Sequence, residues 1–241
     1  MTEIEPDPVG PKSALLGWML GIFTNPRATF TDLQQSISLK QLLVPLLLVL
    51  AVSLTAQGYL RPLAIEEQRS RFAQRDDLTE EQMEEIFDRL DEAAVTGAKQ
   101  YLLAGLAGLA WLAILTGVVM FFGNFILGGE GRGAAAATIV VFVSLIGILE
   151  LAVKVPLMLQ AGSTQVETGL ALLLPRSMEG SLVYRYFHRL DFFGIWKVGL
   201  TALGTAVLFR VSEKQAGYAY FGAWAAVMLL MALIFDRLLT G

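Results

Sequence analysis

The chain has 241 residues, of which 55% are hydrophobic and 17% charged, and its net charge is −4. Because it is slightly acidic, the basic surface that nucleic-acid binding needs is missing, and we expect no nucleic-acid partner. With no cysteine and a single histidine, disulfides, thiolate chemistry and His-rich metal sites are excluded, and no cofactor is expected.

The first 38 residues are predicted to lie outside the membrane core. Residues 1–12 hold three prolines and several acidic groups, which predict a flexible tail without the positive start of a cleavable signal. Residues 13–38 predict two short helices, the second opened by Asn25 as N-cap and Pro26 at the first helical position. Both helices are too short to span a membrane, so we expect them to lie in its interface.

Residues 39–241 are predicted to form a membrane domain with five spans. Each apolar run has roughly the 20 residues that cross a hydrocarbon core of about 30 Å as a helix. The glycine-rich segment 128–133 is interpreted as a plain turn, because it lacks the spacing of a phosphate-binding loop. The second loop, residues 160–191, lies between the third and fourth spans. Its residues 169–174 are apolar but too short to cross, so we expect them to dip into the interface or cap the bundle. The predicted spans lie at about 39–60, 101–127, 134–159, 192–209 and 218–239.

Residues 61–99 are expected to form a long polar loop that contains one amphipathic helix. Thr79 and Gln82 have the spacing of a capping box at its start. Apolar residues then recur at the i, i+3, i+4, i+7 spacing of one helical face. Two interpretations stay open, in which this stripe either packs on the protein's own surface or docks a partner or the membrane. The stripe consists of Met83, Ile86, Phe87 and Leu90.

A few ionisable residues fall inside or beside the predicted spans. Such groups cost about 2.5–3.5 kcal/mol each at a helix centre, so they usually face the bundle interior or a cavity. Glu150 and Lys154 have the favourable i, i+4 spacing, and Lys197 and Asp191 belong to the same side of the membrane. We expect a Glu150–Lys197 or Glu150–Lys154 pair. The group is either a structural pair that holds the third and fourth spans in register or a polar pathway or headgroup-binding site.

No catalytic arrangement is visible in the sequence, and no enzyme activity is predicted. An intramembrane protease needs a Ser–His pair or two membrane aspartates, and Ser144 has no histidine inside a span to activate it. His188 stands between Arg185 and Arg189 and is expected to lie at the membrane interface.

The distribution of positive residues predicts one orientation. Six Lys and Arg residues lie in loops on the N-terminal side and ten on the side of the long loop. By the positive-inside rule, this count places the long loop in the cytoplasm.

The chain resembles bacterial members of the Yip family of membrane proteins, which are named for their interaction with Rab/Ypt proteins. The resemblance rests on an NPxxTF pattern within 23–30, a Gly-Gly turn at 127–131 and an LDxFxIW-like pattern at 190–196, preceded by the apolar stretch 170–175. It covers roughly residues 14–240 in the same order. The acidic loop 61–99 departs from the familiar pattern.

The resemblance implies five spans, a cytoplasmic N-terminus, a C-terminus on the opposite face and no enzyme activity. We follow it for orientation, against the count of positive residues. It predicts a protein of the bacterial cytoplasmic membrane that organises the membrane or binds partners, with membrane lipids, proteins or a second copy as partners. An alternative is a transporter or lipid-handling subunit that uses the Glu150/Lys197 region.

Overall fold

The structure is a computed structural model, and it describes residues 11–35, 38–75, 78–94, 97–166, 168–178 and 181–239. The all-α prediction is confirmed for these residues, whose one β-type pairing is an isolated bridge between Gly169 and Asp191. The predicted tail lies outside them, except for Pro11 and Lys12, which begin the first helix. The elements are α1 (Pro11–Thr24), α2 (Pro26–Gln35), α3 (Leu39–Ala73), α4 (Glu80–Ala94), α5 (Ala98–Met120), η1 (Phe121–Ile126), α6 (Gly133–Ala161), η2 (Leu170–Leu173), η3 (Arg176–Met178), α7 (Leu182–Arg189), α8 (Phe192–Leu208) and α9 (Glu213–Leu239).

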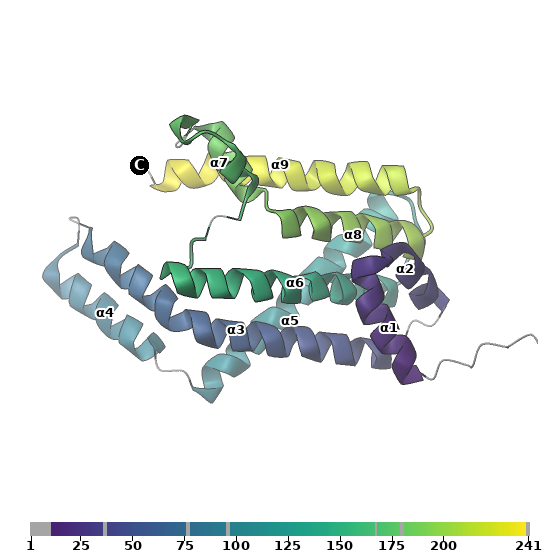
Figure 1. Cartoon of the computed structure of the whole chain (residues 1–241), viewed down its shortest axis with the longest axis horizontal. Coiled ribbons are helices and arrows are strands. Elements are labelled where there is room, and N and C mark those ends of the chain that lie inside the picture. The colour runs from purple at the N-terminus through teal and green to yellow at the C-terminus, as the bar shows by residue number, and fades with distance from the viewer. Residues whose placement is uncertain are drawn as a thin grey trace, which may run out of the picture.

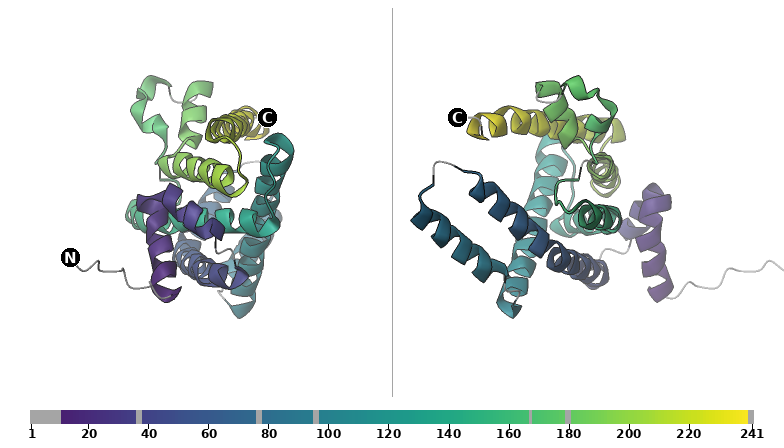
Figure 2. Two further views of the ribbon diagram at one scale, coloured as in Figure 1. Left: turned by 90° about the vertical axis from the view of Figure 1, so that its right-hand side faces the viewer. Right: turned by 60° about the vertical axis from the view of Figure 1, so that its left-hand side comes forward.

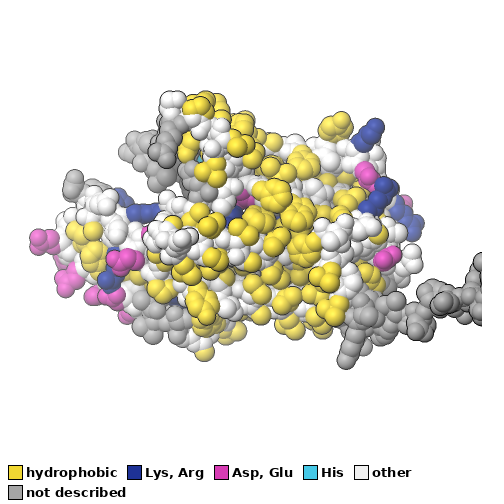
Figure 3. All heavy atoms as spheres, viewed as in Figure 1, with side chains coloured by type: hydrophobic (Ala, Val, Ile, Leu, Met, Phe, Trp, Pro, Cys, Tyr) yellow, Lys and Arg dark blue, Asp and Glu magenta, His cyan; other side chains and the backbone are white. Residues whose placement is uncertain are grey.

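Helices α3, α6, α8 and α9 run side by side along the longest axis, and α5 crosses them obliquely (Figures 1 and 2). Helix α6 lies at the centre and packs against α3, α5 and α8. Its first half is almost entirely buried between Ala135 and Ile146, because it carries only apolar and small side chains there. In the view of Figure 3, hydrophobic side chains form a broad band between two charged ends, as expected for a membrane protein.

Among the described residues, four helices are long and apolar enough to cross a membrane. They correspond to the first, second, third and fifth predicted spans. Helix α8, the predicted fourth span, has 17 residues and is therefore about 25 Å long. It packs between α6 and α9 and lies alongside both, antiparallel to each of them (Figure 1). The four long segments are Gln41–Ala73, Ala98–Ile126, Gly133–Ala161 and Glu213–Ile234.

Helices α1 and α2 begin and end close to the predicted positions, and α1 runs across the long helices rather than along them (Figures 1 and 2). Helix α2 packs against α8, where it buries Phe30 and Leu33. Gly204 permits this close approach, because a Cβ atom there would lie 2.9 Å from Cζ of Phe30. Gln34 also donates a hydrogen bond from Nε2 to the backbone oxygen of Val207, at 2.8 Å. The second short helix is therefore an integral part of the bundle.

Helix α3 continues well past the predicted end of the first span at about residue 60, and the expectation that a loop begins at residue 61 is wrong. The helix runs unbroken through Pro62 to Ala73. Pro62 removes the helical hydrogen bond that its own N–H would donate and crowds the carbonyl one turn earlier, but the residues after it are mostly good helix formers. The extension is also tethered to the end of α6, because Glu67 accepts hydrogen bonds from the Ser163 hydroxyl at 2.5 Å and the Thr164 amide at 2.8 Å.

The glycine-rich turn between α5 and α6 packs around a buried aromatic ring. Phe209, between α8 and α9, is 1% exposed, and a Cβ atom on Gly123 or Gly131 would lie 2.3 or 2.1 Å from its Cδ1. The side chain of Asn124 holds the turn closed by bonding both the amide and the carbonyl of Gly131, at 2.9 and 3.0 Å. The turn therefore fixes the α5–α6 connection against the α8–α9 connection.

The second loop contains a helix that was not predicted, α7. Ser181 caps it by accepting a hydrogen bond from the amide of Tyr184, at 3.1 Å. The apolar segment before it forms the 3-10 turn η2, and the amide of Leu170 bonds the carbonyl of Leu190 at 2.8 Å. Helix α7 packs against both η2 and α9, so the loop is compact and ends where α8 begins.

Candidate functional site

The four ionisable residues predicted to share one side of the membrane are brought together between α6 and α8. Glu150 accepts a hydrogen bond from Nζ of Lys154 at 2.5 Å through one carboxylate oxygen and one from Nζ of Lys197 through the other. Lys154 also donates to Oδ2 of Asp191, at 3.2 Å. The side chains thus form a chain of alternating charge, Lys197–Glu150–Lys154–Asp191, which we call the charge network.

Each member of the charge network is positioned by regular structure. Glu150 and Lys154 are one turn apart on α6, where the i, i+4 spacing brings their side chains together. Asp191 is the N-cap of α8, and its Oδ1 accepts a hydrogen bond from the amide of Gly194 at 2.6 Å. Its other oxygen is thereby free to meet Lys154. Asp191 therefore both begins α8 and ties that beginning to α6.

The charge network is largely shielded and electrically balanced. The side chains of Glu150 and Lys154 are 17% and 16% exposed, and that of Lys197 is 35% exposed. Two carboxylates face two ammonium groups, so the network adds no net charge to the bundle. Nζ of Lys154 also lies 5.8 Å from the centre of the Phe193 ring, within the range of a cation–π contact. This arrangement stabilises the α6–α8 pair.

Both pairings expected for Glu150 are present in the structure. The contact of Lys154 with Asp191 was not foreseen, although an aspartate directly before the fourth span is a typical N-cap and could have indicated its position. His188 lies outside the network, and its ring stacks on that of Tyr184 with 6.4 Å between the centroids. Whether the four residues have a functional role beyond packing stays a prediction.

The amphipathic stripe on α4 packs against the extension of α3. The predicted capping box forms, with the Thr79 amide donating to Gln82 at 3.0 Å and the Gln82 amide donating to the Thr79 hydroxyl at 3.3 Å. Leu90 is buried, and the Arg69 guanidinium lies 5.7 Å from the centre of the Phe87 ring. Met83 and Ile86 are half-buried. Arg69 also pairs with Asp91.

This packing corresponds to the interpretation in which the stripe covers the protein's own surface. Docking of a partner on the stripe of Met83, Ile86, Phe87 and Leu90 stays a prediction, and it would require α4 to leave α3. Among the residues that the structure describes, no three His, Asp or Glu side chains are placed to hold a metal ion.

Comparison with known proteins identifies the family. A family model described as the Yip1 domain matches residues 20–235. No curated protein matches the chain, and no solved structure does. The matched range contains the charge network, the glycine turn around Phe209 and the packed α2 helix, so it spans nearly the whole bundle. The chain therefore belongs to the Yip1 domain family.

Proposed function

We propose that this protein is a membrane interaction protein, which organises partners or lipids around it and catalyses no reaction. The observation that supports this proposal is the closed charge network. Glu150, Lys154, Lys197 and Asp191 satisfy one another within the bundle, so they place no net charge in the hydrophobic band between the two charged ends (Figure 3). A surface of this kind suits contacts with lipid or with other membrane helices.

We further propose that α8 crosses the membrane as the fourth of five spans, in a bacterial cytoplasmic membrane. Its 17 residues are at the lower end of the length that a span requires, about 17–25 residues. Its charged residue, Lys197, is neutralised by Glu150, which lowers the cost of placing it in the membrane. In this topology the N-terminus is cytoplasmic and the C-terminus is on the opposite face.

Helix α1 is the part of the molecule that we propose contacts partners. It lies across the bundle, and its Leu16 and Leu20 side chains are 61% and 67% exposed. Its neighbour α2 is anchored by buried Phe30, so α1 is presented on a rigid support. Pre-organisation of this kind lowers the entropic cost of binding.

Affinity purification from cross-linked native membranes tests the proposal. We expect the wild-type chain to recover a reproducible protein partner, and the double variant Leu16→Ser/Leu20→Ser to lose it without unfolding, since both side chains are exposed. The matched control is Leu172→Ser/Leu173→Ser, which changes the same residue type in the exposed η2 turn. Recovery of only the protein itself, or equal loss with both double variants, would contradict the proposal.

Transport or lipid handling at the charge network would give a different result. In that case Glu150→Gln and Lys197→Met would abolish the biological activity while leaving partner recovery intact. The interaction proposal instead expects that both variants keep the activity and only melt at a lower temperature.

A further inference from the structure

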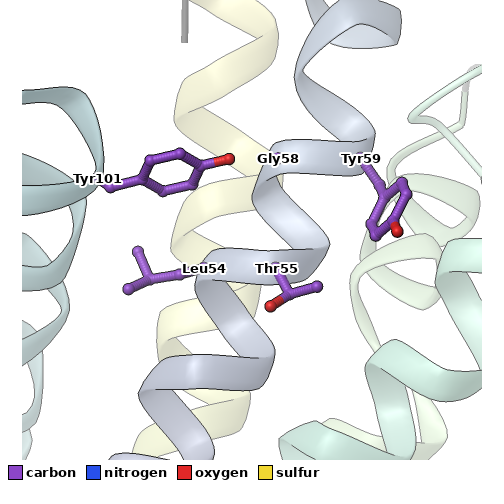
Figure 4. A pocket seen from close by; sticks show the side chains of 5 residues that line it. All are labelled: Leu54, Thr55, Gly58, Tyr59 and Tyr101. Atoms are coloured by element: carbon purple, nitrogen blue, oxygen red, sulfur yellow. The ribbon is translucent and has the colours of Figure 1, made fainter. Parts of the chain in front are cut away.

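Helices α3 and α5 enclose a groove that the proposed function does not use. The two helices pack closely where Gly108 and Gly105 of α5 face α3, because Cβ atoms there would lie 3.3 Å from Leu50 and 4.0 Å from Leu54. Beyond this contact, toward the N-terminus of α5, a cavity of about 450 Å³ opens between them. It is lined by Leu54, Thr55, Gly58, Tyr59 and Tyr101 (Figure 4).

The absence of a side chain at Gly58 makes room for the Tyr101 ring on this face of α3. Figure 4 shows the Tyr101 ring reaching from α5 toward Gly58, and a Cβ atom on Gly58 would lie 2.7 Å from the Tyr101 hydroxyl. Leu54 lies one turn below. The Thr55 hydroxyl donates a hydrogen bond to the Ala51 carbonyl at 2.8 Å, which satisfies its only donor. The end of the groove at Leu54 is therefore apolar, and the Tyr101 hydroxyl lies at its other end, beside Gly58.

The groove lies at the level where α3 changes from apolar to charged. Tyr59 and Tyr101 are 66% and 40% exposed, and exposed tyrosines favour the boundary between hydrocarbon and headgroups. Arg61 is three residues after Gly58 and seven after Leu54, so it belongs to the same face of α3, one turn farther out. Arg61 takes part in none of the ion pairs formed among the described residues.

We propose that this groove is a binding site for a glycerophospholipid. One acyl chain lies against Leu54, the ester region meets the Tyr101 hydroxyl beside Gly58, and the phosphate pairs with Arg61. The order of apolar surface, hydroxyl groups and cation along α3 matches the order of these parts in the lipid. The short length and polar rim of the groove make it unsuitable for a transmembrane helix of a second copy.

Native mass spectrometry of the full chain tests the role of the phosphate. The probes are dioleoyl phosphatidylglycerol and dioleoylglycerol, which has the same acyl chains but no phosphate. We expect Arg61→Gln to weaken phosphatidylglycerol binding by about fivefold, the effect of one basic residue near an anionic lipid, and to leave dioleoylglycerol binding unchanged. Added inorganic phosphate should not displace the lipid, because it cannot occupy the apolar end.

The control for charge is Lys99→Gln. Lys99 is two residues before Tyr101 on α5, so the two side chains point to different sides of that helix, and this variant should bind as the wild type does. If Lys99→Gln weakens binding as much as Arg61→Gln does, the basic residues attract anionic lipid in a nonspecific way, and the proposed site is wrong.

The control for shape uses two glycines of the same helix pair. Gly58→Leu places its side chain where the Tyr101 hydroxyl lies, which closes this end of the groove, and should abolish retention of both probes. Gly117→Leu introduces the same side chain on α5 where a Cβ atom meets nothing within 4 Å, and retention should persist. Circular dichroism in detergent confirms that both variants are folded. Binding of phosphatidylglycerol by folded Gly58→Leu at the wild-type level would overturn the inference.

Discussion

At the scale of single residues, the charge network explains how four ionisable groups are accommodated between α6 and α8. An unpaired charge inside a bundle is costly, but a pair with complementary hydrogen bonds removes much of that cost. Glu150 is the centre of the network, since it alone contacts both lysines. We therefore expect the loss of Glu150 to lower the stability of the protein more than the loss of Lys197 or Asp191, at the ends of the network.

The first prediction concerns the loss of Glu150. Glu150→Gln leaves Lys197 without its carboxylate partner, while Lys154 keeps Asp191. Removing one partner of a buried pair costs about 3–5 kcal/mol. Because Lys197 is 35% exposed, we expect a loss near the lower end, about 3 kcal/mol, in the free energy of unfolding. Unfolding by sodium dodecyl sulfate, followed by circular dichroism, measures it.

The double variant Glu150→Gln/Lys197→Met is the control for this prediction. It removes the stranded ammonium group together with its partner, so it should recover most of the lost stability. A double variant that is as unstable as the sum of its single variants would show that the two side chains act independently, contrary to the structure.

At the scale of elements, sequence patterns predicted helices well where the local signal was complete. The start of α4 was predicted from its capping box, and the start of α2 from Asn25 and Pro26. The continuation of α3 through Pro62 was missed, because proline usually marks a boundary and the tether from Glu67 to Ser163 comes from almost 100 residues away. Helix α7 was missed although Ser181 is a typical N-cap, because its eight residues are too few to show a clear helical period and the helix also depends on packing against α9.

The charge network shows the same division between local and distant information. The Glu150–Lys154 pair follows from helical spacing alone, and the contact with Lys197 follows from the order of the spans. The additional contact of Asp191 depends on how the loop after α6 returns to begin α8. No pattern within the sequence of that loop predicts that Asp191 comes close to Lys154.

The glycine turn provides the second prediction, because it joins two connections of the bundle. In Gly131→Ala the new methyl group would lie 2.1 Å from Cδ1 of Phe209, a ring that is almost fully buried. Overpacking of this kind typically costs about 1–3 kcal/mol, so we expect a clear decrease in melting temperature. Thermal unfolding in detergent, followed by circular dichroism, measures this effect.

Gly133→Ala is the matched control for Gly131→Ala. It places the same methyl group two residues later, at the start of α6, where nothing lies within 4 Å. Alanine also favours helix formation over glycine, so this variant should be as stable as the wild type or slightly more stable. Equal destabilisation by the two variants would mean that Phe209 is not the cause.

At the scale of the whole molecule, the path of α8 through or along the membrane determines which elements lie on the same side of the membrane. If α8 crosses the membrane, α4 and α7 are on one side, and the α8–α9 turn is on the other side with α1 and α2. Arg27 of α2 pairs with Glu213 at the start of α9, at 2.8 Å, so the second group is held together at one end of the bundle. Two exposed positions, Glu84 on α4 and Ser212 before α9, can be used to determine on which side of the membrane each group lies.

The third prediction uses the absence of cysteine from the chain, which makes single-cysteine labelling direct. With a cytoplasmic N-terminus, a maleimide that cannot cross membranes should label Glu84→Cys in intact cells, and Ser212→Cys only after the membrane is opened. The opposite pattern would keep five spans and reverse the orientation, as the excess of Lys and Arg around the long loop favours. Labelling of both cysteines from the same side would contradict a membrane-crossing α8, because an odd number of spans, α5, α6 and α8, separates the two positions.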